Sequence, residues 1–144
     1  MANRLTRGKG VFGSVAASGP ITAASVTQSS VSFTVGTESA NTINVAMVFK
    51  DGVGVTQAVP KAGMWYLSDV ATGLTPSTTA PNSGIAVGTN GKITKWTTNL
   101  SGFFVTTAAG LLDLTLSESG TPTFYLVIVM PNGSLSVSGA ITFA

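Results

Sequence analysis

The sequence predicts an all-β protein: a single antiparallel β-sandwich or jelly-roll-like domain with an extended N-terminal arm. Apolar and polar residues alternate with a period of two in one segment after another, and no long stretch repeats at the period of a helix. Turn residues, among them 17 glycines, separate these segments. Turns spaced about 8–12 residues apart are typical of sandwiches and jelly rolls. We place the arm at residues 1–21 and the domain at residues 22–144.

The first half of the domain contains two alternating strands and an expected hairpin. Residues 30–35 alternate Ser and Thr with Val and Phe, and residues 43–50 repeat the pattern. Asp51-Gly52 follows at once, and Asp-Gly between two apolar runs is a strong hairpin signal. Residues 53–59 are therefore expected to form the return strand.

A short strand at residues 64–67 is followed by the longest irregular segment, residues 68–84, which is rich in Thr, Ser, Pro and Gly. Long loops in compact domains usually carry a function or make contacts. Residues 85–87 are then expected to pair with residues 93–96 across the turn Thr89-Asn90-Gly91.

Further strands are expected at residues 102–107 and 111–116. In the second of these segments, Leu alternates with more polar residues. Residues 123–130 are nearly all apolar, as expected for a central strand that is buried on both faces. Pro131-Asn132-Gly133 then turns the chain into a last strand at residues 134–143.

The composition excludes several function classes. The chain has no Cys and no His, which excludes thiol nucleophiles, classical triads and ordinary zinc sites. Its longest strictly apolar stretch, residues 126–130, is far short of the about 20 residues that a membrane helix needs. Charged residues make up 8% of the chain, against about 25% in an average soluble domain. We infer a surface that is largely covered by other protein.

Three carboxylates were the only candidates for catalysis or metal binding: Asp69, Asp113 and Glu118. A glycosidase uses such a pair as acid and base. We expect all three to be solvated surface acids, and their spacing lacks the oxygen-rich pattern of a calcium loop. The sequence therefore predicts no metal, no cofactor and no enzymatic activity.

Basic residues gather at the start of the chain. The first nine residues contain Arg4, Arg7 and Lys9 and no acid, whereas the rest has four lysines against five acids. The arm is either an ordinary solvated terminus or a segment that docks on an acidic surface. Three basic residues without interleaved aromatic residues are a weak signal for nucleic-acid binding, so we do not expect nucleic acid as a partner.

The aromatic residues Trp65, Tyr66 and Trp96 are candidates for an interface. Aromatic residues are enriched at the centres of protein interfaces, and they also fill cores. A carbohydrate-stacking platform, as in a lectin, is the alternative.

Three motifs resemble those of a known group of proteins. They are Tyr-Leu-Ser-Asp at 66–69 with Ala-Thr-Gly at 71–73, the segment 83–91, and the ending from 124 through Pro-Asn-Gly at 131–133 to 144. Together they resemble small structural proteins of tailed bacteriophages that are encoded among the head genes. The resemblance covers about residues 25–144.

The resemblance implies a virion component, foremost a capsid decoration or cement protein that binds the major capsid protein on the outer capsid surface. It implies no catalytic residue. We also expect a homo-oligomer, with a trimer as first expectation, because closed symmetry buries apolar surface and capsid lattices offer three-fold positions. The alternatives are a tail or head-fibre component, a lectin-like host-binding module, and a hydrolase with a carboxylate pair.

Overall fold

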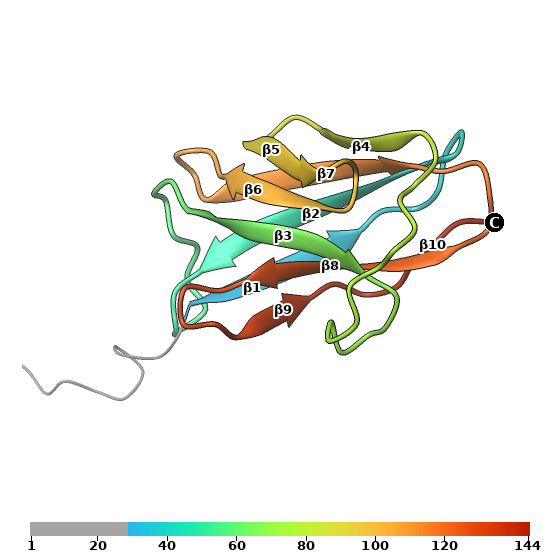
Figure 1. Ribbon diagram of the computed structural model, residues 1–144. Helices are drawn as coiled ribbons and strands as arrows, with labels where there is room; N and C mark the ends of the chain where they lie inside the picture. The colour runs from blue at the N-terminus through green and yellow to red at the C-terminus, as the bar shows by residue number, and fades with distance from the viewer. Residues whose placement is uncertain (1–28) are drawn as a thin grey trace, which may run out of the picture.

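The computed structural model describes residues 29–144, which fold into two antiparallel sheets packed face to face (Figure 1). The predicted all-β sandwich is thus confirmed for these residues. Arg4, Arg7 and Lys9, with the predicted boundary near residue 21, lie outside the described residues. Within the described part of the chain, no helix is long and apolar enough to cross a membrane.

The first sheet has four strands. In spatial order they are β1 (Ser30–Val35), β2 (Thr42–Lys50), β7 (Leu111–Ser117) and β4 (Gly84–Val87). The second sheet has six strands. In spatial order they are β10 (Ile141–Thr142), β8 (Thr123–Val129), β3 (Ala62–Ser68), β6 (Ser101–Val105) and β5 (Lys92–Thr97), with β9 (Leu135–Val137) also paired to β8. The expected last strand is therefore interrupted into β9 and β10.

The core lies between the two sheets and is built by the alternation that the sequence shows. In β2 every second residue, from Ile43 to Phe49, is buried, and the leucines at 112, 114 and 116 of β7 lie beside them on the same face. The second sheet contributes its own inward-facing residues: Trp65, Leu67, Phe104, Phe124, Leu126 and Ile128. Burial of these side chains supplies the main driving force for folding.

The hairpin expected across Asp51-Gly52 is wrong. β2 pairs with β1 on one side, and on the other β7 pairs with its residues 42–48, so only the end of β2 at Phe49 and Lys50 is free to meet the returning chain. Residues 53–59 form an irregular loop with a single bridge between Lys50 and Thr56. Asp51 Oδ1 organises the loop by accepting the Val53 and Val55 N–H groups, and the positive φ falls on Gly54 rather than on Gly52.

The pairing expected between residues 85–87 and 93–96 is also wrong. β4 pairs with β7 in the first sheet, and β5 pairs with β6 in the second. The segment between them therefore crosses from one sheet to the other instead of forming a hairpin turn. The Asp113 carboxylate holds this crossover by accepting the backbone N–H groups of Thr89 and Asn90.

Candidate interaction surfaces

The outward face of the second sheet is covered at one end and bare at the other. The loop after β3 folds back over the covered end, where the Tyr66 hydroxyl donates to the Gly73 carbonyl at 2.6 Å. A Cβ atom at Gly73 would lie within 3.2 Å of the side chains of Val127 and Val137, so the loop packs tightly on the sheet. Figure 1 shows this segment between β3 and β4 as a long loop, as expected for residues 68–84.

The bare end of this face carries four large apolar side chains, which we call the apolar face. They come from three neighbouring strands and are between 37% and 52% exposed: Met64, Trp96, Phe103 and Val105. The rings of Trp96 and Phe103 pack edge to face with centroids 4.1 Å apart. Met64 lies directly opposite Phe103 in the β3–β6 pairing. The four side chains therefore form one contiguous surface.

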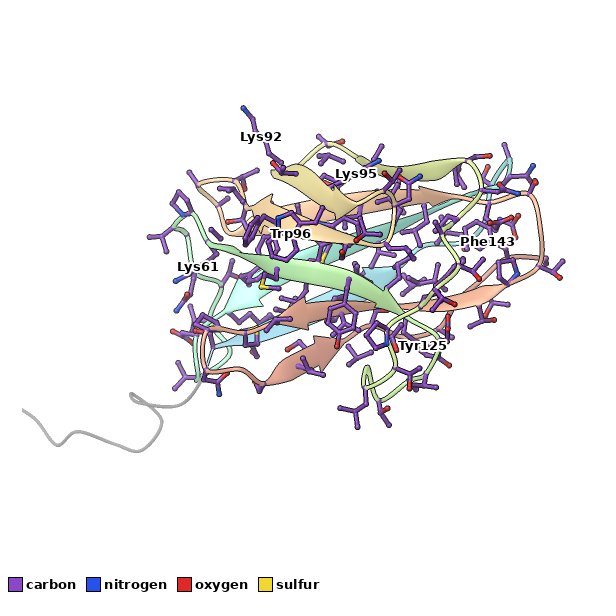
Figure 2. The ribbon with its side chains drawn as sticks, viewed as in Figure 1. Lys61, Lys92, Lys95, Trp96, Tyr125 and Phe143 are labelled. Atoms are coloured by element: carbon purple, nitrogen blue, oxygen red, sulfur yellow. The ribbon has the colours of Figure 1, made fainter. Side chains whose placement is uncertain are left out.

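Local geometry explains why these residues point outward. Phe103 and Phe104 are consecutive in β6, so they must face opposite sides of the sheet, and Phe104 is the one in the core. In β5, Thr94 lies opposite Phe103, so Trp96, two residues further on, points to the same outward side, and the register with β6 shifts at this position. Figure 2 shows Trp96 over the second sheet, with Lys92 and Lys95 above it in this view.

One charged side chain of these strands borders the apolar face: Lys92, which lies opposite Val105. Lys95 lies opposite Gly102 and donates from Nζ to the Asn99 side chain at 2.6 Å, on the side of the first sheet. No Asp or Glu occurs in β3, β5, β6 or β8. A complementary partner surface would be apolar at its centre, with an acid opposite Lys92.

The structure separates the three aromatic residues that the sequence singled out. Trp65 is only 1% exposed and lies in the core, so it offers no surface to a partner. Tyr66 is half-buried under the loop, and burial raises the pKa of its hydroxyl. Only Trp96 belongs to the apolar face. Phe103 and Met64 were missed because alternation alone does not show which side of a strand faces the core.

The expectation that all three candidate carboxylates are solvated is wrong for two of them. Asp69 is exposed, but Asp113 and Glu118 are each 6% exposed. Both buried carboxylates accept backbone N–H groups, Glu118 from Asn82 and Gly120. Among residues 29–144, no group of three or more Asp, Glu, His or Cys side chains gathers to hold a metal. The buried acids thus hold loops in place.

Opposing effects act on the pKa of Asp113. Burial alone would raise the pKa of this carboxyl group. Hydrogen bonds from the Thr89 N–H, the Asn44 side-chain amide and the Asn90 N–H outweigh burial and hold the pKa below the ordinary value of 3.8. Asp113 is therefore a charged structural group at neutral pH.

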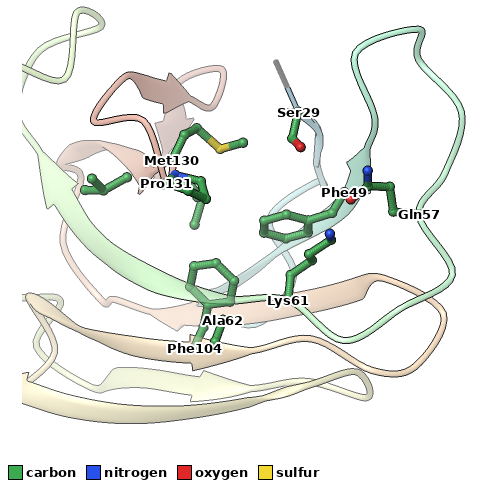
Figure 3. Close-up of a pocket in the computed structure, with 10 residues that line it drawn as sticks. Ser29, Phe49, Gln57, Lys61, Ala62, Phe104, Met130 and Pro131 are labelled. Atoms are coloured by element: carbon green, nitrogen blue, oxygen red, sulfur yellow. The ribbon is translucent and has the colours of Figure 1, made fainter. Parts of the chain in front are cut away.

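A small cavity opens at the end of the sandwich next to Ser29 (Figure 3). Its volume is about 60 Å³, and its walls include Phe49, Phe104 and Met130 with Lys61 and Gln57. Small-molecule sites are usually about 300–1,000 Å³ in volume. This cavity has room for a few water molecules, for which the buried and unpaired Gln57 Oε1 offers an acceptor.

No protein-family model matches the chain, and no curated protein or solved structure is significantly similar to it. The resemblance to bacteriophage structural proteins therefore stays a prediction.

Proposed function

We propose that the protein is a bacteriophage capsid decoration or cement protein that binds the major capsid protein on the outer surface of the virion. It acts by contact and not by catalysis, as a homo-oligomer, and it requires no cofactor, nucleic acid or membrane. The apolar face built by Trp96, Phe103, Met64 and Val105 is the observation that carries this proposal.

The apolar face has the composition of an interface centre. Aromatic residues and Met are enriched at such centres, and charged residues are depleted there. Contiguous exposed apolar patches of more than a few hundred Å² usually mark binding sites, and the four side chains together approach that size. Two half-exposed aromatic rings, packed on each other on β5 and β6 at one edge of the second sheet, are well placed to anchor a partner.

The size of the apolar face suits binding to a lattice. Trp96 and Phe103, each about half exposed, together offer about 200 Å². A stable interface between two proteins buries about 800 Å² on each side. This face alone therefore supports a weak contact, and many such contacts made at once on a shell give strong attachment through avidity. Cementing a capsid is a task of this kind.

A lectin-like host-binding module is the second candidate, because an exposed Trp can stack on a sugar ring. Sugar sites also need polar side chains that hydrogen-bond the hydroxyl groups. The side chain packed against Trp96 is Phe103, with Met64 opposite Phe103, and the polar side chains nearby on this face are the hydroxyls of Thr94 and Ser101. This composition favours a protein partner over a glycan.

The apolar face is tested by binding to capsids from which the protein has been stripped. We expect Trp96→Ser combined with Phe103→Ser to weaken binding about 30-fold, because central aromatic residues commonly contribute about 2 kcal/mol or more. Leu74→Ser is the matched control, since Leu74 is 76% exposed but lies in the loop between β3 and β4. Equal binding of both variants would contradict the proposal. Binding of the wild type to tails only would favour the tail-component alternative.

The same capsid assay tests the basic arm. Replacing Arg4, Arg7 and Lys9 together with Gln is expected to weaken binding roughly ten-fold at low salt, because exposed charge pairs contribute about 0.2–1 kcal/mol each. The difference between wild type and variant should fall at high salt, where surface charges are screened. Unchanged occupancy at low salt would mean that the arm is an ordinary solvated terminus.

A further inference from the structure

β1 has one paired edge and one free edge. Within residues 29–144 it pairs with β2 alone, at the end of the first sheet. The Gly36 N–H donates to the Asn44 carbonyl just beyond β1, so the even-numbered residues of β1 bond to β2. Because hydrogen-bonding directions alternate along an antiparallel strand, the backbone groups of Val31, Phe33 and Val35 point to the free edge.

β1 also lacks the features that usually protect an edge strand. Charged side chains, bulges and short length discourage pairing with another chain. β5, at one edge of the second sheet, has Lys92, Lys95 and a bulge. β4, β9 and β10 contain only four, three and two residues. β1 contains six residues without a charge, a proline or a bulge.

The two faces of β1 have different compositions. Val31, Phe33 and Val35 point inward and are only partly buried against the core. Ser30, Ser32 and Thr34 point outward and are exposed. A strand that paired here would continue the core with apolar side chains on one face and would meet hydroxyl groups on the other.

We propose that the free edge of β1 pairs antiparallel with β1 of a second copy, about a two-fold axis at Phe33. In an antiparallel pair, opposite residues point to the same face, so a strand can pair with itself only about an axis at a residue position. With the axis at Phe33, Val31 lies opposite Val35 of the second copy, and Ser32 lies opposite Thr34. Every pair is then apolar with apolar or hydroxyl with hydroxyl.

This self-complementarity is what selects a second copy as the occupant. Apolar and Ser/Thr cross-strand pairs are favourable, and no like charges meet. The contact joins two four-stranded sheets into one continuous sheet, and it uses a surface different from the apolar face. It is two-fold, so it predicts a dimer where lattice symmetry alone suggested a trimer. It does not depend on the role at a capsid.

The pairing is short and therefore weak. Five paired residues span about 17 Å, well below the extent of a standard interface. We expect the full-length protein to change reversibly from monomer to dimer between about 10 µM and about 1 mM, as measured by sedimentation equilibrium. A single monomeric species over this range, or a trimer as the first assembled species, would overturn the proposal.

Charge substitutions on the outward face test the register. Ser32→Lys with Thr34→Lys places lysines opposite each other twice across the axis, so the dimer should weaken about ten-fold. Ser32→Lys with Thr34→Glu instead places Lys opposite Glu twice, so it should restore the affinity of the wild type. Failure of the second pair to restore dimerisation would rule out the axis at Phe33.

Two controls keep the interpretation specific. Thr94→Lys with Thr97→Lys adds the same charge to exposed positions of the edge strand β5 and should leave the dimer unchanged. All variants should melt at the same temperature as the wild type at low concentration, because the substituted side chains are exposed.

Hydrogen exchange of the Val31 and Phe33 amides should slow as protein concentration rises. Protection that is independent of concentration would mean that the chain covers its own edge, which would overturn the proposal.

Discussion

Trp65→Ala is expected to lower the free energy of unfolding by about 3–5 kcal/mol, whereas Trp96→Ala should lower it by less than about 1 kcal/mol. Trp65 is among the largest fully buried side chains of the described chain and lies opposite Gly102 and Ile128 in the central strands of the second sheet. Its removal leaves a cavity that neighbouring strands cannot close without shifting. Trp96 is 52% exposed, so its removal mainly uncovers one side of Phe103.

Urea denaturation monitored by tryptophan fluorescence measures the loss of unfolding free energy in both variants, because the chain contains only two tryptophans. The Trp96→Ala variant keeps the buried tryptophan, and its emission should shift strongly to the red on unfolding. The Trp65→Ala variant keeps the exposed one, and its emission should shift little, so circular dichroism serves as the second probe. Equal destabilisation by the two substitutions would mean that the apolar face is part of the folded core rather than a surface.

The contrast between these two tryptophans shows which features of the fold can be predicted from the sequence. Alternation predicts most of the strands, because side-chain direction in a strand is a local property, but residues 53–59 form a loop. Alternation also places Trp65 and Tyr66 on opposite faces. It does not say which face is the core, because that depends on where the second sheet packs. The contact of Trp96 with Phe103 depends in addition on the pairing of β5 with β6, which neither segment shows alone.

Strand partners were the least predictable part of the fold. Asp51-Gly52 is a good local turn signal, but β7 already pairs with residues 42–48 of β2, so the returning chain meets only the end of that strand and forms no strand of its own. Thr89-Asn90-Gly91 reads as a hairpin turn, yet β4 and β5 lie in different sheets. The deciding residue there is Asp113, which is 23 residues beyond Asn90 in the chain. Long-range pairing of this kind leaves no local signal.

Asp113→Asn is expected to lower the free energy of unfolding by about 2 kcal/mol near neutral pH. The carboxylate accepts the Thr89 N–H at 2.8 Å and the Asn44 amide at 3.1 Å, together with the Asn90 N–H. An asparagine at this site must turn an NH₂ group toward one of these donors, and each buried donor left without an acceptor costs about 1–3 kcal/mol. Gly88 adds to the constraint, because a Cβ atom there would overlap Asp113 Oδ2, so the crossover has little room to adjust.

The loss of unfolding free energy caused by Asp113→Asn should also depend on pH. The lowered pKa of Asp113 determines the direction of that dependence. Since the folded protein holds the pKa of Asp113 below 3.8, the folded state binds the proton less readily than the unfolded state does. The stabilisation by the carboxylate is therefore fully present above the unfolded pKa of about 3.9 and is lost as the pH falls through the folded pKa.

Measured by urea denaturation, the difference in unfolding free energy between wild type and Asp113→Asn should be constant from about pH 7 to about pH 5 and should shrink below about pH 4. Asp69→Asn is the matched control for the loss of a carboxylate, since Asp69 is exposed and does not hold the crossover, and this substitution should cost little stability. A difference for Asp113→Asn that stayed constant down to the acid transition would mean that shape, rather than the charge of the carboxylate, holds the segment between β4 and β5.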